Sequence, residues 1–577
     1  MSTLSTFSDG TLPDVSGVYA PPDSGLLIDL ALDANEGPGG CMDLASLVSR
    51  TGPDVARKYP SSADLEQALA ASWGIDASRL VVTAGGDEAI DRACRAFLSS
   101  GRELILPTPT FEMIARYAAL TRATIRTTPW PQGPYPIDAV LGQINERTAM
   151  IAVVSPNNPT GAVATVSDLK RLGTAAPGAI ILVDLAYAEF ADEDLTAAAI
   201  ELPNVIAIRT FSKAFGLAGL RVGYAMGSES NVRALRAAGS PFPVSSLSLA
   251  AAEDAIRRAP AVLPGVVARV RDERAGLSKL LVSLGSTPLP SQGNFVLAEF
   301  ADAQWVWRSL GSLGIGVRRF NPSAGLDRSL RITCPGNASS FDRLCTGLRT
   351  ALRPQGLLFD LDGVIADVSG SYRRAIVLTA ESLGVRLTLG DIHAAKAEGN
   401  ANNDWVLTHR LLDRNGVQAS LSEVTARFES FYHGEDGTPG LSASERLIPE
   451  RALLERLAAR LPLAVVTGRP RADCEFFLHR FGLRDLFRAV VCMEDAPVKP
   501  DPAPVRLALD QLGISSAWMI GDTPDDINAA RLAGVIPIGV PPPSLTGEPD
   551  GATHAALMRA GAARVLDSLN ELETLLP

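Results

Sequence analysis

Histidine and cysteine are scarce in this chain, and both shortages limit its chemistry. It has 577 residues but only five histidines and six cysteines. Every histidine lies at or after His393, so the segment before it cannot use a Ser-His-Asp or Cys-His catalytic device. The cysteines are scattered and form no C-x-x-C pair, which indicates reduced structural thiols and neither a disulfide framework nor a zinc site.

Long apolar runs and excess positive charge are also missing. No apolar run reaches the roughly 18 residues of a transmembrane helix, and the N-terminus does not resemble a signal peptide. The net charge of −11 disfavours binding to nucleic acid or to an acidic membrane. With 46% hydrophobic and 20% charged residues, the chain has the composition of a globular enzyme. We expect a cytoplasmic enzyme that acts on small molecules.

The pattern of apolar runs predicts an α/β fold in two domains. Runs that end in Gly, Asp or Asn alternate with helical stretches, as in "LVVTAGGDEAIDRACRAFL", which is typical of parallel sheets. The length is too great for a single core. A helical stretch stops at Pro354, and the pattern restarts at "GLLFDLDGV" (356–364). We therefore expect one domain over residues 1–353 and another over 354–577.

Lys213 stands in a run of small, apolar and hydroxylated residues, "RTFSKAFGLAGLRVGYAMG" (209–227). This lysine has two possible explanations. It can be a desolvated amine with a lowered pKa, which forms a Schiff base with a carbonyl. It can also be an ordinary lysine on a helix face whose amine reaches water. Asp184 ends a predicted strand, where α/β proteins bind ligands, and Asn158 lies in the turn "SPNNPTGA". The start of a helix at Gly86 and Asp87 would be an anion site. Each of these features also occurs in proteins for structural reasons alone, since turns rich in glycine, asparagine or proline commonly follow strands.

Three motifs in this order, "NNPTG", "VDLAY" and "TFSKAFGLAGLRVGY", resemble the fold-type I aminotransferases that use pyridoxal 5'-phosphate. The resemblance is greatest to the histidinol-phosphate aminotransferase family and extends over roughly residues 15–350. The segments "LDANEGP", "KYP", "PTPTFEM", "GNF" and "LRIT" fall at the expected places. The chain departs from the family pattern at Asp33, where Asn is usual, and at Phe111, where Tyr is frequent.

The resemblance implies a role for each matching residue. Lys213 would hold the cofactor's aldehyde and then carry a proton between the substrate α-carbon and the cofactor. Asp184 would keep the pyridine nitrogen protonated, Asn158 and Tyr187 would bind the ring oxygen, and Phe111 would stack on the ring. The cofactor phosphate would be held by Gly86, Asp87, Thr210, Ser212 and Arg221.

The same resemblance implies substrate ligands and a homodimer. Arg331 would bind the acidic group of glutamate, 2-oxoglutarate or the phosphorylated substrate, and Arg318 or its neighbour Arg319 would be a second phosphate ligand. Tyr19 would close over the phosphate. Tyr59 would reach the cofactor phosphate in the other subunit of a homodimer.

A second series of polar residues follows predicted strands in the C-terminal half. Asp360 and Asp362 follow "GLLF", Thr467 follows "LAVV", Lys499 precedes a proline, and Asp522 and Asp526 follow "AWMIG". Carboxylates hold Mg²⁺, a lysine and a hydroxyl offset the charge of a transferring phosphoryl group, and a carboxylate nucleophile divides the reaction into two steps. A single Asp-x-Asp can be only a turn, but the ordered series indicates phosphoryl transfer.

This series resembles the haloacid-dehalogenase-like (HAD) phosphatases over about residues 355–577. The resemblance implies that Asp360 is the nucleophile, that Asp362 is the acid and base, and that Thr467 and Lys499 bind the phosphoryl group. Mg²⁺ would be held by Asp360, the Asp362 carbonyl, Asp522 and Asp526. Residues from about 368 to 450 look helical and resemble the cap of this superfamily. His409 and His433 lie in that cap, where packed or solvated histidines are favoured over substrate contacts.

The two resemblances together suggest consecutive steps. The first half would convert imidazole acetol phosphate and glutamate to histidinol phosphate and 2-oxoglutarate, and the second half would hydrolyse histidinol phosphate to histidinol. Three alternatives remain open from the sequence. The same chemistries could act on another small phosphorylated ketone, the second half could be a phosphomutase or a housekeeping phosphatase, or one half could be a non-catalytic module.

Overall fold

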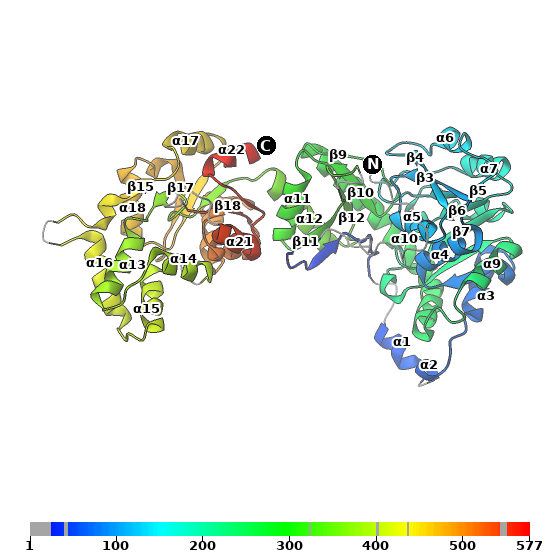
Figure 1. Ribbon diagram of the computed structural model, residues 1–577, viewed down its shortest axis with the longest axis horizontal. Helices are drawn as coiled ribbons and strands as arrows, with labels where there is room; N and C mark the ends of the chain where they lie inside the picture. Colours follow the sequence, from blue (N-terminus) through cyan, green and yellow to red (C-terminus); the bar gives the residue numbers. More distant parts are fainter. Residues whose placement is uncertain are drawn as a thin grey trace. The chain divides into compact units, whose positions relative to one another are not determined.

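The computed structural model describes residues 23, 25–39, 44–52, 54–321, 325–399, 403–435, 438–542 and 551–576 (Figure 1). These residues divide into two compact units. The first comprises residues 31–303 and 317–343, and the second comprises 23–30, 304–316 and 344–577. The central sheet of the first unit is mostly parallel and that of the second is parallel, so each unit can present a site at the carboxyl ends of its strands.

A seven-stranded sheet forms the centre of the first unit. Its strand order is β2-β8-β7-β6-β5-β3-β4, and only β8 runs antiparallel to its neighbours. The strands are β2 (Leu80–Thr83), β3 (Glu103–Thr108), β4 (Thr124–Pro129), β5 (Thr148–Val154), β6 (Ile180–Asp184), β7 (Val205–Thr210) and β8 (Gly223–Gly227). The parallel strands bring the ends of β5, β6 and β7 to one edge.

Helices cover both faces of this sheet because its strands are apolar on both sides. Ile151 and Val153 of β5 belong to one buried cluster, and the alternating Met150 and Ala152 belong to the other. One cluster includes residues of α3 (Ala63–Trp73), α7 (Val166–Ala175), α8 (Thr196–Ile200) and α10 (Ser246–Ser283). The other includes residues of α4 (Gly85–Phe97), α5 (Glu112–Leu120) and α9 (Glu229–Ala238).

A second sheet of five strands has the order β1-β11-β12-β10-β9. Its strands are β1 (Leu30–Leu32), β9 (Thr287–Pro288), β10 (Phe295–Glu299), β11 (Ile315–Arg319) and β12 (Ser329–Thr333). The remaining helices up to residue 352 are α1 (Leu44–Arg50), α2 (Asp54–Arg57), α6 (Ile137–Leu141), α11 (Ala303–Ser312) and α12 (Ala338–Leu352). Arg318 of β11 pairs in register with Arg331 of β12, so the two guanidinium groups start from neighbouring positions.

The second unit has a six-stranded parallel sheet of order β17-β16-β13-β18-β19-β20. The strands are β13 (Leu357–Phe359), β16 (Leu463–Val466), β17 (Phe487–Val491), β18 (Trp518–Gly521), β19 (Ile536–Gly539) and β20 (Arg564–Val565). Its helices are α17 (Arg451–Arg460), α18 (Arg471–Arg480), α19 (Ala503–Leu512), α20 (Pro524–Leu532), α21 (Gly551–Ala560) and α22 (Leu572–Leu575). The central strand β13 lies between β16 and β18, which brings their ends together.

In the sequence between β14 (Ala366–Asp367) and β15 (Arg446–Leu447), which pair with each other, the described residues form four α-helices. Figure 1 labels these helices. They are α13 (Tyr372–Ser382), α14 (Leu389–Ala397), α15 (Asp404–Arg414) and α16 (Leu421–His433). We call these four helices the cap. The cap helices fall in the segment for which the sequence predicted helices, and α12 ends two residues before Pro354.

The predicted α/β fold class is confirmed, since both units are built on sheets flanked by helices. Among the described residues, no helix is both long enough and apolar enough to cross a membrane.

Candidate active sites

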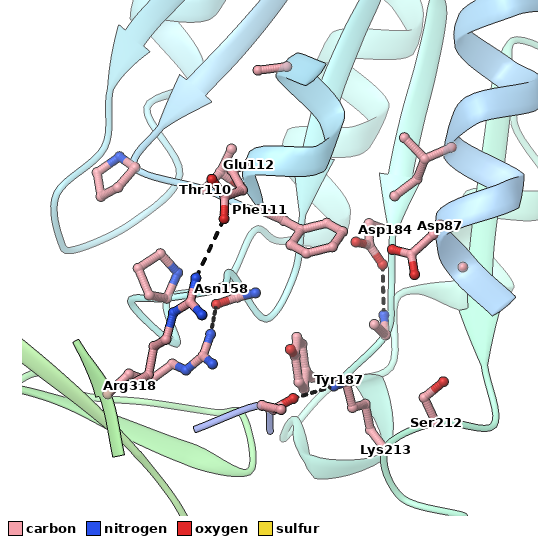
Figure 2. A pocket seen from close by; sticks show the side chains of 18 of the residues that line it. Asp87, Thr110, Phe111, Glu112, Asn158, Asp184, Tyr187, Ser212, Lys213 and Arg318 are labelled. Atoms are coloured by element: carbon pink, nitrogen blue, oxygen red, sulfur yellow. Dashed lines mark hydrogen bonds and ion pairs between the residues drawn. The ribbon is translucent and has the colours of Figure 1, made fainter. Parts of the chain in front are cut away.

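A cavity of about 1070 Å³ in the first unit brings together most of the residues singled out there (Figure 2). It opens where β5, β6 and β7 end and where α4 begins, as expected for parallel strands. Twelve of the predicted residues line it: Gly86, Asp87, Phe111, Asn158, Asp184, Tyr187, Thr210, Ser212, Lys213, Arg221, Arg318 and Arg331.

Lys213 is half-buried in the wall of this cavity. Its Nζ donates a hydrogen bond to the main-chain oxygen of Ala34 at 2.9 Å and lies 5.7 Å from the centre of the Tyr187 ring. Desolvation lowers the pKa of Lys213 to about 8, and the positive charge of Arg331 acts in the same direction. About a tenth of the amine is therefore neutral and nucleophilic at pH 7, far more than for an ordinary lysine.

Asp184 and Tyr187 are both buried beside this amine. Burial raises the pKa of Asp184 to about 6, although its carboxylate accepts a hydrogen bond from the Ala186 amide at 3.0 Å. The Tyr187 hydroxyl accepts a hydrogen bond from Asn35 Nδ2 at 3.0 Å, and burial raises its pKa to about 12. Asp184 thus supplies a carboxylate that a cationic ring nitrogen would stabilise.

The edge of the cavity next to α4 is suited to an anion. In the described chain no side chain caps the N-terminus of α4, so its first amides can point toward a ligand. Arg221 lies there and pairs with Asp87 at 2.6 Å, while Thr210 Oγ1 donates to Ser212 Oγ at 2.8 Å. Positive charge, hydroxyls and helix amides therefore lie close together.

Glycine lets the backbone approach closely at this edge. A Cβ on Gly223 would lie 2.6 Å from the carbonyl carbon of Gly85, far inside van der Waals contact. Strand β8 and the start of α4 can adjoin only because Gly223 has no side chain.

Two arginines enter the cavity from the five-stranded sheet (Figure 2). Arg331 donates hydrogen bonds to Asn158 Oδ1 and, at 2.5 Å, to the main-chain oxygen of Asp33. Arg318 lies 3.5 Å from a Glu112 carboxylate oxygen. Arg318 lines the cavity and Arg319 is absent from its lining. The contact between Arg331 and residue 33 does not depend on the side chain of Asp33, because Arg331 binds the main-chain oxygen.

The two remaining predicted residues do not join the cavity. Tyr59 is 82% exposed and stacks on Phe242 with 4.7 Å between ring centres. Tyr19 lies outside the described residues. Sequence reasoning missed Glu36, Glu112 and Phe320, which also line the cavity. Glu36 and Glu112 lie inside the segments "LDANEGP" and "PTPTFEM", which resemble the family, but the resemblance gave them no role. Phe320 lies in no quoted motif, and only the tertiary structure brings it to the site.

In the second unit, three carboxylates converge at the ends of β13 and β18. The oxygens of Asp360, Asp522 and Asp526 lie within 4.8 Å of one another, and all three side chains are buried. Lys499 Nζ lies 2.7 Å from Asp360 and 2.5 Å from Asp526, and it donates to the Val466 main-chain oxygen at 2.9 Å. Thr467 is buried at the end of β16, the strand next to β13.

Burial dominates the electrostatics of this cluster. Desolvation raises the pKa of Asp360 well above its ordinary value, against the opposing charge of Lys499. It also raises the pKa of Asp522 to about 7, helped by the charge of Asp526. Burial alone would lower the pKa of Lys499, but the charges of Asp360 and Asp526 raise it. Carboxylates held so close together favour a bound cation.

Gly363 lets the chain pass close to one of these carboxylates. Its φ is +79°, and a Cβ there would lie 2.1 Å from Asp522 Oδ2. The chain after Asp362 therefore turns against Asp522 at a position that requires glycine.

Three cationic side chains near this cluster carried no signal in the sequence. Arg469 Nε donates to Asp362 Oδ1 at 2.5 Å, and both Nη atoms bond the buried carboxylate of Glu445, at 3.2 and 3.1 Å. Arg373, on cap helix α13, lies 3.8 Å from Asp522. On α14, Lys396 is desolvated, which alone would lower its pKa, but the charges of Asp404 and Asp522 raise it. The cap thus brings positive charge toward the carboxylates of the core.

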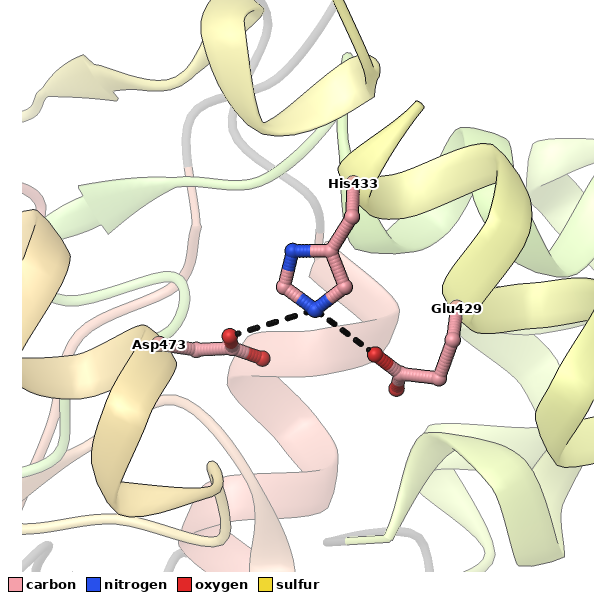
Figure 3. A group of neighbouring side chains, drawn as sticks. All are labelled: Glu429, His433 and Asp473. Carbon is pink, nitrogen blue, oxygen red and sulfur yellow. Dashed lines mark ion pairs between the residues drawn. The ribbon is translucent and has the colours of Figure 1, made fainter. Parts of the chain in front are cut away.

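Both cap histidines singled out in the sequence are paired with protein groups. His433 Nε2 lies 2.8 Å from Glu429 and 3.5 Å from Asp473, as Figure 3 shows. His409 has Nδ1 3.3 Å from Asp413 and Nε2 3.0 Å from the Ala419 main-chain oxygen. Neither histidine lines the large cavity of the first unit or a smaller cavity that lies beside Asp362.

Comparison with known proteins matches two successive segments of the chain to known families. Residues 51–348 match the family model "Aminotransferase class I and II", and residues 357–540 match "Haloacid dehalogenase-like hydrolase". A histidinol-phosphate aminotransferase from Ruegeria pomeroyi is 36% identical over 316 residues, which cover 53% of this chain and 86% of that protein. The structure of histidinol-phosphate aminotransferase from Sinorhizobium meliloti, in complex with pyridoxal-5'-phosphate, is 25% identical with a TM-score of 0.51. It covers 56% of this chain and 91% of its own.

A further relative has a different name. An imidazoleglycerol-phosphate dehydratase from Phytophthora nicotianae is 46% identical over 237 residues, which cover 39% of this chain and 52% of that protein. The chain thus spans about half the length of this relative.

The fold and the matches therefore define an α/β enzyme with an aminotransferase domain and a hydrolase domain. The chain belongs to the aminotransferase class I and II family, and it carries a haloacid dehalogenase-like hydrolase domain after it.

Proposed function

We propose that the chain catalyses two consecutive reactions, transamination between glutamate and imidazole acetol phosphate, and hydrolysis of the resulting histidinol phosphate to histidinol. The observation that carries the proposal is the presence of two separate sites, a lysine-aspartate cavity and a buried carboxylate-lysine cluster. The relatives named for histidinol phosphate and imidazoleglycerol phosphate support this choice of substrate.

The residues of the first cavity fit pyridoxal 5'-phosphate. Lys213 offers a desolvated amine, Asp184 a buried carboxylate, and the start of α4 with Arg221 an anion site. The Sinorhizobium relative supports this cofactor. When bound, the group supplies an electron sink for the substrate α-carbon.

Each protein group then has a defined task in transamination. Asp184 would stabilise a protonated ring nitrogen, and Asn158 and Tyr187 would donate to the ring oxygen. Phe111 would cover the ring, while Gly86, Asp87, Thr210, Ser212 and Arg221 would hold the phosphate. Lys213 would remove the proton from the substrate α-carbon and deliver it to the C4′ carbon of the cofactor, because its amine is desolvated and therefore partly neutral. Arg331, with Arg318, would fix the acidic groups of the substrates.

The residues of the second cluster fit Mg²⁺, since buried carboxylate oxygens are the ligands that this ion prefers. Asp360, Asp522 and Asp526 would hold it together with the main-chain oxygen of Asp362. When bound, the ion offsets the charge of the phosphoryl oxygens.

Hydrolysis would proceed in two steps. A carboxylate oxygen of Asp360 attacks phosphorus and forms an O–P bond, while the bond to the substrate oxygen breaks and Asp362 gives that oxygen a proton. Water then attacks the aspartyl phosphate, Asp362 takes its proton, and inorganic phosphate leaves. Lys499 and Thr467 would neutralise and orient the phosphoryl oxygens throughout.

We also propose that the aminotransferase unit forms a homodimer. Tyr59 and Phe242 form an exposed stacked aromatic pair, 82% and 50% exposed, which suits burial against a second copy. Tyr59 could then reach the cofactor phosphate of that copy. Sedimentation of the purified chain should give twice the mass of 60.7 kDa.

A direct test is phosphate release from histidinol phosphate by the purified chain with Mg²⁺. We expect turnover that Asp360→Asn abolishes and Lys213→Ala leaves intact. Absence of release by the wild type would reject the second step. If the chain released phosphate from other esters but not from histidinol phosphate, the substrate of the pathway would be a different phosphorylated ketone.

A further inference from the structure

A small cavity of about 20 Å³ lies beside Asp362 in the second unit. Its walls come from core and cap alike: Asp362, Tyr372, Asn403, Asp404, Trp405, Gly468, Arg469, Pro470 and Met493. A space of this volume holds about one water molecule. The cap therefore has to withdraw from the core before a larger group can enter.

The proposed chemistry determines which part of a substrate this cavity receives. Asp362 protonates the oxygen of the leaving alcohol, so that oxygen must come within hydrogen-bond reach of its carboxylate. The phosphoryl group lies on the other side of the same oxygen, against Asp360 and Lys499. The cavity beside Asp362 consequently faces the alcohol part of the ester.

The cap side of the cavity carries a buried carboxylate and aromatic rings. The Asp404 side chain is only 9% exposed, and its Oδ1 lies 3.1 Å from Lys396 Nζ. Tyr372 and Trp405 line the same space. A carboxylate next to aromatic side chains is a chemistry that recognises organic cations, and a guanidinium, that of Arg469, already lies over the Tyr372 ring.

On the core side of the cavity, the positively charged side chain is already paired with carboxylates. Among the lining residues, Arg469 carries the one guanidinium, and it bonds both oxygens of Glu445 as well as Asp362. The Arg469 guanidinium carbon lies 4.8 Å from the centre of the Tyr372 ring. The Tyr372 hydroxyl donates a hydrogen bond to Asp473 at 2.8 Å. With the direct partners of the lining residues included, four carboxylates (Asp362, Asp404, Glu445 and Asp473) surround the cavity, against the two cations Arg469 and Lys396. This excess of negative charge favours a positively charged guest.

We propose that this cavity recognises an ammonium group on the alcohol part of the substrate, with Asp404 as a specificity-determining residue. The inference rests on the proposed function and deepens it. Transamination replaces a carbonyl by a carbon that bears an ammonium group, so the phosphate esters before and after it differ in charge. A site that prefers the cation hydrolyses the amine product and spares the ketone, which sets the order of the two reactions.

The test compares pairs of phosphate esters in the Lys213→Ala chain, which cannot interconvert them. One pair is histidinol phosphate and its analogue without the amino group. A second pair is phosphoethanolamine and ethyl phosphate. We expect kcat/KM to favour the ammonium ester by at least about tenfold in each pair. Asp404→Asn should reduce this ratio toward one while hydrolysis of an aryl phosphate without an amine continues.

Asp413→Asn is the matched control, since Asp413 lies on the same helix but is 43% exposed and pairs with His409. It should leave the ratio unchanged. Because Asp404→Asn removes the carboxylate nearest Lys396, the double variant Asp404→Asn/Lys396→Gln is measured beside it and should lose the preference too.

The outcomes separate this inference from the proposed function. A wild-type ratio near one, or a ratio that survives both Asp404 variants, overturns the inference even when histidinol phosphate is hydrolysed. A clear preference for phosphoethanolamine with no hydrolysis of histidinol phosphate supports the inference and contradicts the proposed substrate.

Discussion

At the residue scale, both sites depend on charged groups held where water is scarce. Lys213 is a cation whose pKa falls to about 8 mainly through desolvation, and Asp184 is a carboxylate whose pKa rises to about 6 for the same reason. Such shifts make the groups reactive near neutral pH and also lower the stability of the fold. Reactivity and stability are therefore opposed at these positions.

Lys213→Met should stabilise the cofactor-free protein while abolishing transamination. The folded pKa of about 8 lies below the ordinary 10.5, so the unfolded state binds more protons between these values and stability rises with pH there. The variant should lose this pH dependence, and its free energy of unfolding should be about 1–2 kcal/mol higher than that of the wild type at pH 7. This value is smaller than the full pKa shift would give, because water in the cavity screens the charge. Thermal denaturation at pH 7 and pH 10 measures both effects.

The exposed Lys170 provides the control, since Lys170→Met should change neither the slope nor the midpoint. A Lys213→Met protein that melts lower than wild type at pH 7 would contradict the desolvation argument.

Lys499→Met should have the opposite effect. Lys499 is 2% exposed and lies against both Asp360 and Asp526, so its loss leaves buried carboxylates without their cation. Breaking a buried pair costs about 3–5 kcal/mol. We expect a lower melting temperature and no phosphatase activity, with transamination retained below the transition. Lys279→Met, at an exposed helix position, should melt like the wild type, and equal melting of both variants would refute the argument.

At the scale of elements, strand ends could be predicted from the sequence and the cap contacts could not. A run such as "IILVD" must be a buried strand, and a parallel sheet carries its last residue, Asp184, to the ligand edge. Asp360, Thr467 and Asp522 follow the same rule. Arg469 was missed although it comes two residues after Thr467, because no quoted motif marked it as a partner of Asp362. Arg373 of cap helix α13 was missed because only the folded cap brings it to Asp522.

Gly223→Ala tests the junction between β8 and α4. The added methyl group would lie 2.6 Å from the Gly85 backbone, so the strand and the helix start would have to separate. We expect at least a tenfold loss in affinity for pyridoxal 5'-phosphate and a stability loss of about 1–3 kcal/mol. Fluorescence titration of the cofactor-free protein measures the affinity.

Gly178→Ala is the companion variant, since nothing lies within 4 Å of a Cβ at that position. Equal cofactor affinity in the two variants would show that the close approach at Gly223 has no part in binding.

At the scale of the whole molecule, the chain joins two chemistries that use separate residues. The aminotransferase match ends at residue 348 and the hydrolase match begins at residue 357. None of the residues lining the large cavity belongs to the carboxylate cluster. Each activity should therefore be removable alone, whereas a single shared site would lose both together.

The most direct measurement incubates the purified chain with Mg²⁺, 2-oxoglutarate and histidinol phosphate and follows glutamate and free phosphate in the same sample. The wild type should form both. Lys213→Ala should form phosphate without glutamate, and Asp360→Asn should form glutamate without phosphate. Loss of both products in either variant, or neither product in the wild type, would contradict two independent sites acting in sequence on histidinol phosphate.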